Sequence, residues 1–93
     1  MNSHQQKLYK MIDDILWFEW DPMGINNVGA RNEYDSYVPQ VYHLKISGAS
    51  KTEIANYLEK VATANMGLTS MIEFNEKIAD RIVALKDYSA DYE

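Results

Sequence analysis

The fold of this chain is decided by the stretch Trp17-Phe18-Glu19-Trp20-Asp21-Pro22-Met23-Gly24-Ile25-Asn26-Asn27, where a helical pattern gives way to turn-forming residues. A residue that precedes proline is disfavoured in the α region, so Asp21-Pro22 is expected to end a helix, and the glycine and asparagines that follow favour turns. Upstream of this stop we predict a helix from about residue 4 to 19, with Ser3 as its N-cap. Its apolar stripe recurs every three or four residues and consists of Leu8, Met11, Ile12, Ile15 and Phe18.

The position of Pro39 restricts where a second helix can begin. If Asn32 were the N-cap, Pro39 would lie inside the helix and remove a backbone hydrogen bond. If Ser36 is the N-cap, Pro39 lies in the first turn, where its missing N–H is harmless. We therefore favour Ser36, and we expect Ser47-Gly48-Ala49 to end this helix.

Two further helices are predicted, each from a capping-box pattern. Ser50-Lys51-Thr52-Glu53 predicts the start of the third helix, and Met66-Gly67-Leu68 predicts its end. Thr69 or Ser70 is predicted to cap the fourth helix, because Ser70 and Glu73 have capping-box spacing. The predicted apolar faces comprise Ile54, Tyr57, Leu58, Val61 and Met66 in the third helix, and Met71 or Ile72, Phe74, Ile78, Ile82 and Leu85 in the fourth.

These four patterns predict an all-α fold, a small irregular four-helix bundle in which residues 1–93 form a single domain and residues 87–93 a frayed tail. The connection between the first two helices is about fifteen residues long, so we expect it to be structured by its own aromatic residues or to be functional. The chain has no cysteine, which excludes disulfides and thiolate metal sites. The absence of cysteine fits a cytoplasmic location, which we expect. No run approaches the ~20 apolar residues of a membrane span, so we expect a soluble protein without a membrane partner.

A combination of motifs in the middle of the chain resembles a known group of proteins. The motifs are Trp20-Asp21-Pro22-Met23-Gly24, then Glu33-Tyr34-Asp35-Ser36-Tyr37-Val38-Pro39, then Ser47-Gly48-Ala49-Ser50, and finally Met66-Gly67-Leu68. Together they resemble a group of small uncharacterised bacterial helical proteins with a W-D-P-x-G and E-Y-D-S-Y-x-P pattern. The resemblance implies a helical fold and an association with bacterial toxin-immunity loci, and the group provides no known activity that could be carried over to this chain.

The negative charge of the chain is concentrated in one segment. The sequence carries 14 acidic and 9 basic residues, which gives a net charge of -5. Residues 13–35 hold six acids and the single base Arg31, which leaves the same excess of five within this segment. A negative chain disfavours DNA and RNA, which proteins bind through surplus lysine and arginine. We therefore expect no nucleic-acid partner and a basic protein partner.

We predict that this acidic segment carries the partner-binding residues. Its carboxylates would speed the encounter with a basic partner, and its aromatic rings would provide contact area. Trp20 is instead expected in the core, Asp21 is expected to accept backbone hydrogen bonds in an Asx-type turn, and for Trp17 both roles stay open. Adjacent residues on a helix point about 100° apart, so the two neighbouring aspartates are not expected to share one site. The predicted partner-binding residues are Asp13, Asp14, Trp17, Glu33, Tyr34, Asp35 and Tyr37.

No catalytic residue, metal site or cofactor is predicted. His43 would need Glu33 and Asp35 as further metal ligands, but Asp35 lies two helical turns, or ~12 Å, before it. The serines are explained as helix caps, and the segment 47–58, which resembles the first helix of a helix-turn-helix, lacks the basic residues of that motif. Three functions stay open. We favour an immunity or inhibitor protein that neutralises a cationic bacterial toxin such as a nuclease, and the alternatives are a small carboxylate- or metal-dependent hydrolase and a homodimeric structural accessory protein.

Overall fold

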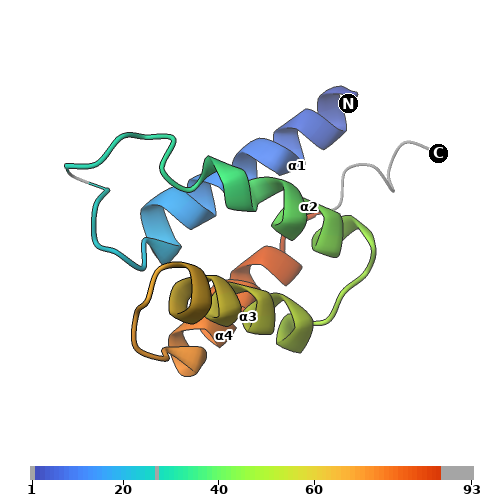
Figure 1. Cartoon of the computed structure of the whole chain (residues 1–93). Helices are drawn as coiled ribbons and strands as arrows, with labels where there is room; N and C mark the ends of the chain where they lie inside the picture. Colours follow the sequence, from blue (N-terminus) through green and yellow to red (C-terminus); the bar gives the residue numbers. More distant parts are fainter. Residues whose placement is uncertain (1, 27, 87–93) are drawn as a thin grey trace.

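A computed structural model describes residues 2–26 and 28–86 of the chain, and its regular structure is entirely helical. Two π-helical segments continue α1 and α3, and a 3₁₀ turn leads into α2 (Figure 1). No strand occurs in the described residues, which confirms the all-α class, whereas the predicted frayed tail at residues 87–93 lies outside them. The elements in chain order are α1 (Ser3–Asp14), η1 (Ile15–Trp20), η2 (Asp35–Tyr37), α2 (Val38–Ile46), α3 (Lys51–Lys60), η3 (Val61–Asn65) and α4 (Ile72–Val83).

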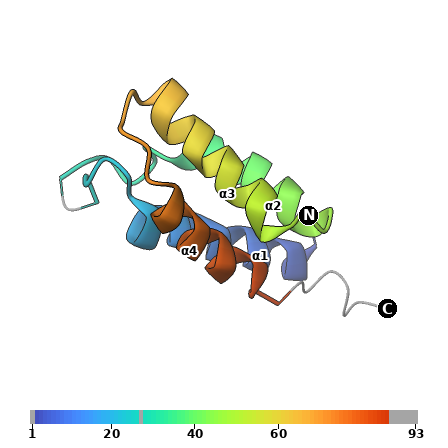
Figure 2. The ribbon, with the colours of Figure 1, turned by 90° about the horizontal axis from the view of Figure 1, so that it is seen from below.

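The helices pack in pairs around one apolar core. α3 packs along α4, α1 packs against α2, and η1 also contacts α4 (Figures 1 and 2). The described part is flattened, with extents of 42 × 27 × 17 Å. None of its helices is long and apolar enough to cross a membrane. The largest fully buried apolar side chains are Trp20, Tyr34, Leu8, Ile12, Leu16, Ile54, Leu58, Ile82, Val38 and Val41.

The first helix begins one residue earlier than predicted. Asn2 is the N-cap, because its side chain accepts from the Gln5 N–H at 2.8 Å and its own N–H donates to the Gln5 side chain at 2.9 Å. The prediction that Ser3 is the N-cap is wrong, because Ser3 is the first residue of α1. Asn2 and Gln5 are only three residues apart, so this capping box depends on neighbouring residues alone.

The end of this helix is π-helical, and this changes which side chains face the core. The Asp21 N–H donates to the Leu16 carbonyl at 3.0 Å, across five residues, and the chain leaves the helix at Asp21 with a φ of 28°. The stop before Pro22 is therefore confirmed. The π-helical phase buries Ile15, Leu16, Trp17 and Trp20, and it turns Phe18 outward, where its side chain is 62% exposed. The prediction that Phe18 continues the buried stripe is wrong.

The second helix confirms the position of its proline but not its cap. Pro39 lies in the first turn of α2, as predicted. Ser36 is not the N-cap, because it lies inside η2, where the Tyr37 N–H already donates to the Tyr34 carbonyl at 3.0 Å. The predicted end is confirmed, since α2 ends at Ile46 and Gly48 adopts a φ of 80°, a value that glycine reaches without strain.

The third helix follows the prediction at both ends, whereas the start of the fourth does not. Ser50 and Glu53 form the predicted capping box at 3.2 Å in both directions, and Gly67 after η3 adopts a φ of 70°. At α4 the N-cap position is Met71, without a side-chain cap from its own segment. Neither Thr69 nor Ser70 caps this helix, because Glu59 of α3 accepts from the Met71 N–H at 3.0 Å and from the Ser70 hydroxyl.

A buried amide joins α4 to two other segments. Asn75 is fully buried, and its Oδ1 accepts from the Trp20 Nε1–H at 2.9 Å. Its Nδ2 donates to Glu59 Oε1, also at 2.9 Å. The inner face of α4 thus consists of Asn75, Ile78, Ala79 and Ile82, and Phe74, which was predicted to face the core, is 39% exposed.

We predict that Asn75→Ala lowers the free energy of unfolding by about 2 to 4 kcal/mol, because it leaves the buried Trp20 indole N–H without an acceptor and opens a small cavity. Asn56→Ala, at an exposed position of α3, is the matched control and is expected to change stability by less than about 0.5 kcal/mol. Urea unfolding at neutral pH measures both. Equal effects of the two substitutions would show that the amide does not join these segments.

Candidate partner-binding site

Four aromatic rings from η1, η2 and the segment that connects them pack together at the core. Tyr34 lies between the two tryptophans, with ring centroids 5.7 Å from Trp17 and 5.5 Å from Trp20. Tyr37 meets Trp20 edge to face at 6.3 Å. Such tilted arrangements stabilise aromatic clusters beyond the area they bury.

The burial of this cluster differs from part of the prediction. Trp20 is 1% exposed, which confirms its expected core position. Trp17 and Tyr34 are 4% and 1% exposed, so neither presents the contact area that was predicted for a partner. Both rings are instead needed to cover the end of a small core. Tyr37 is half-buried and keeps part of its ring at the surface.

Asp21 organises the connecting segment as an acceptor of several hydrogen bonds. Its carboxylate accepts from the Ile25 N–H at 2.9 Å and from the Asn26 N–H at 3.2 Å, which confirms the predicted Asx-type turn. The Tyr34 hydroxyl donates to the same carboxylate at 2.7 Å and accepts from the Met23 N–H at 3.3 Å. The two ends of the connection are therefore joined through one carboxylate and one phenol.

The electrostatics of this pair follow from burial and hydrogen bonding. Burial raises the pKa of Asp21, but the hydrogen bonds from the Tyr34 hydroxyl and from backbone N–H groups lower it by more, so it lies below its ordinary value. Burial, together with the neighbouring Asp21, holds the pKa of Tyr34 far above its ordinary value. The charged carboxylate and the neutral phenol are thus the stable forms at neutral pH.

Arg31 reaches back from the connecting segment to the end of α1 and contacts two carboxylates. Its guanidinium donates to both oxygens of Asp13 at 3.1 Å and to Asp14 at 3.0 Å. Lys10 contacts the same two acids, at 3.6 Å from Asp13 and 2.8 Å from Asp14. The expectation that the two neighbouring aspartates cannot share a site is wrong, because a long cation placed between them reaches both.

The same guanidinium lies over two aromatic rings of η1. Its carbon is 5.3 Å from the centroid of the Trp17 ring and 5.5 Å from that of the Phe18 ring, within the range of cation–π attraction. Trp17 is buried beneath it, whereas Phe18 is open to solvent. We call these two exposed residues, Phe18 and Arg31, together with the exposed acids Glu33 and Asp35 that follow Arg31 along the chain, the Arg31 surface.

Sequence reasoning missed Phe18 and Arg31 as surface residues of this site. One signal for Arg31 was present, since it is the single base among six acids of residues 13–35. No comparable signal exists for Phe18, because its outward direction depends on the π-helical phase of η1.

The acids of the segment do not form one free negative surface. Asp13 and Asp14 contact Arg31 and Lys10, Asp21 is used within the connection, and Glu19 pairs with Arg81 of α4 at 2.8 Å. Lys10 and Arg81 lie outside residues 13–35, so they compensate two of the five excess negative charges of this segment in space. Within the described residues, the exposed acids of this segment that form no ion pair are Glu33 and Asp35.

Neither a metal centre nor a known relative defines the chemistry of this surface. In the part of the chain that the structure describes, no three histidine, aspartate or glutamate side chains come close enough to hold a metal ion together. Comparisons with protein-family models, with curated proteins and with solved structures find no match for this chain.

Arg31→Ala is expected to lower the free energy of unfolding by about 1 to 2 kcal/mol, because it removes a bidentate ion pair and two cation–π contacts that tie the connection to α1. Lys10→Ala removes an exposed cation from the same acids and is expected to cost less than about 0.5 kcal/mol. Urea unfolding of both variants at one salt concentration provides the comparison. A larger loss for Lys10→Ala than for Arg31→Ala would contradict this account of the cluster.

Tyr34→Phe tests the bond to Asp21 without removing the ring. The folded-state pKa of Asp21 lies below its unfolded value of about 4, so the stability from this carboxylate is fully present above that value and is lost as the pH falls through the folded pKa. We therefore expect Tyr34→Phe to cost about 1 to 2 kcal/mol at pH 7, and the difference from wild type to shrink as the pH falls below about 4. Unfolding curves between neutral and acidic pH measure this. A difference that stays constant over that range would show that the phenol does not bond to the charged carboxylate.

Proposed function

We propose that the protein is a non-enzymatic binding protein that captures a basic partner protein through the Arg31 surface. In its most concrete form it is an immunity or inhibitor protein that neutralises a cationic bacterial toxin, such as a nuclease. The scaffold that we propose for this task is a small irregular four-helix bundle, whose long structured connection between α1 and α2 carries the surface.

The observation that carries this proposal is the exposed ring of Phe18 beside a fixed guanidinium. Arg31 is held by two carboxylates and by the Trp17 ring, so it loses little conformational freedom when a partner binds. Aromatic and arginine side chains with such preorganisation recur among the residues that contribute most to binding energy. In this arrangement Trp17 and Tyr34 support the surface from beneath rather than contact the partner.

The preference for a basic partner rests on Glu33 and Asp35. Both are exposed, and their charges are available to speed the encounter with a positively charged protein. Asp13 and Asp14 were predicted to be steering charges. They form ion pairs with Arg31 and Lys10, and they support the surface by fixing the position of Arg31. Tyr37, which is half-buried in the turn that follows Asp35, completes the edge of this surface.

Affinity capture with matched baits tests this proposal. The wild-type protein is expected to recover a partner of positive net charge, and its binding kinetics are then measured by surface plasmon resonance at several salt concentrations. Phe18→Ala is expected to raise the dissociation rate about tenfold or more, because it removes the central contact. Asp35→Lys is expected to slow association and to weaken its dependence on salt.

Two controls sit on α4, away from the Arg31 surface. Val83→Ala shortens another exposed apolar side chain, and Asp80→Lys reverses another exposed acid. Both are expected to bind the partner at wild-type rates. An acidic partner would contradict the electrostatic argument, and controls that weaken binding as much as the test variants would contradict the assignment of the surface.

A further inference from the structure

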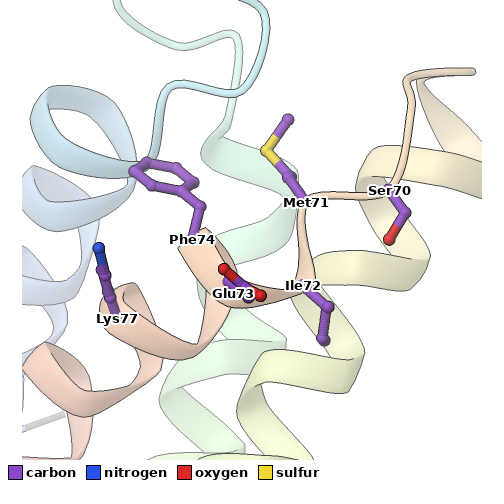
Figure 3. Close-up of a pocket in the computed structure, with 6 residues that line it drawn as sticks. All are labelled: Ser70, Met71, Ile72, Glu73, Phe74 and Lys77. Atoms are coloured by element: carbon purple, nitrogen blue, oxygen red, sulfur yellow. The ribbon is translucent and has the colours of Figure 1, made fainter.

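A depression lies at the start of α4 and uses no residue of the Arg31 surface. It has a volume of ≈ 480 Å³, and Figure 3 shows its lining side chains around the first turn of the helix. Ile72 and Phe74 are 36% and 39% exposed, so apolar atoms of this turn meet solvent. The residues that line it are Ser70, Met71, Ile72, Glu73, Phe74 and Lys77.

Two opposite charges flank the exposed ring of Phe74. Glu73 and Lys77 are four positions apart, which places them one turn apart on the same outer face of α4. Both are exposed, and within the described residues neither belongs to an ion pair. Among the other charged residues of α4, Asp80 lies 3.7 Å from Lys51 and Arg81 pairs with Glu19, whereas the half-buried Glu76 belongs to no ion pair in the described residues and is not part of the lining. The lining of the depression is therefore electrically balanced, with its two charges in a fixed order along the helix.

We propose that this depression is the contact surface for a second copy of the chain, with α4 of each copy packed antiparallel to α4 of the other about a two-fold axis. In an antiparallel pair the order of charges is reversed in the second helix. Glu73 of each copy then faces Lys77 of the other, and Phe74 of each copy enters the depression of the other. The same patch on both copies thus provides Glu73 and its partner Lys77, and such self-complementarity is the defining property of a two-fold interface.

The charge pattern favours this occupant over a foreign protein of strong net charge. A basic or an acidic partner would satisfy one of the two rim charges and would oppose the other, whereas a second copy satisfies both. The Arg31 surface cannot pair with itself in this way, because Glu33 and Asp35 would face like charges. One helix from each copy buries less area than a stable interface of standard size, so the dimer is expected to dissociate in the micromolar range.

Sedimentation equilibrium of the purified chain, over protein concentrations from about 1 µM to 1 mM, tests the dimer. The wild-type protein is expected to show a reversible monomer–dimer equilibrium, and Phe74→Ser is expected to weaken dimerisation at least tenfold. Phe18→Ser, which changes an exposed aromatic residue on the Arg31 surface, is the matched control and is expected to dimerise like the wild type. Circular dichroism confirms that each variant keeps its helical content.

A charge exchange separates this geometry from any other mode of association. Glu73→Lys alone and Lys77→Glu alone each place like charges opposite one another and are expected to weaken the dimer. The double variant Glu73→Lys with Lys77→Glu restores both pairs and is expected to return the dissociation constant to within about threefold of the wild-type value. A wild-type protein that stays monomeric throughout, a double variant that is no better than the singles, or a Phe18→Ser variant that loses the dimer would each overturn the proposal. The first two outcomes leave capture of a basic partner by the Arg31 surface unaffected, whereas loss of the dimer in Phe18→Ser would place the dimer contact on the Arg31 surface itself.

Discussion

The buried Asn75 amide is the interaction on which the rest of this structure depends. Its oxygen accepts from the Trp20 indole, and its nitrogen donates to Glu59, whose carboxylate also holds the chain that enters α4. An amide suits this position because it offers an acceptor on one side and donors on the other. An aspartate would face the Glu59 carboxylate with a second negative charge, and a leucine would leave the indole N–H without a partner.

The position of Trp20 then determines the surface above it. Trp20 supports Tyr34, Tyr34 bonds to Asp21, and Asp21 shapes the turn that begins the connection between η1 and α2. Arg31 emerges from that connection and closes onto α1. The buried hydrogen-bond network thereby positions an exposed patch. Four of the six acids of residues 13–35 form hydrogen bonds or ion pairs within the chain, namely Asp13, Asp14, Glu19 and Asp21.

The stops after η1, α2 and η3 and the start of α3 were predictable from the sequence because they depend on local backbone chemistry, whereas the N-caps predicted for α1 and α2 were wrong. Pro22, Gly48 and Gly67 act on their own segments, and the Ser50 capping box closes within four residues. The start of α4 could not be predicted in this way, since its cap comes from Glu59 on another helix. From the sequence alone, Glu59 cannot be distinguished from an ordinary surface glutamate of α3.

The candidate site was only partly predictable for two physical reasons. The π-helical phase of η1 rotates Phe18 outward and draws Trp17 into the core, and an amphipathic pattern with a period of 3.6 residues does not contain that rotation. Counting charges along the chain located the acidic segment, but it could not show that Lys10 and Arg81 reach those acids from outside it. Spatial pairing, rather than composition, decides which carboxylates stay free.

Hydrogen exchange of the Trp20 indole N–H, followed by nuclear magnetic resonance, tests the central interaction most directly. Because this proton is donated to a fully buried amide, its exchange is expected to require global unfolding, with a protection free energy equal to that of the slowest backbone amides. Exchange at the rate of a solvent-exposed indole in the folded protein would contradict the account, since Trp20 would then not be held by Asn75 and could not position the connection above it.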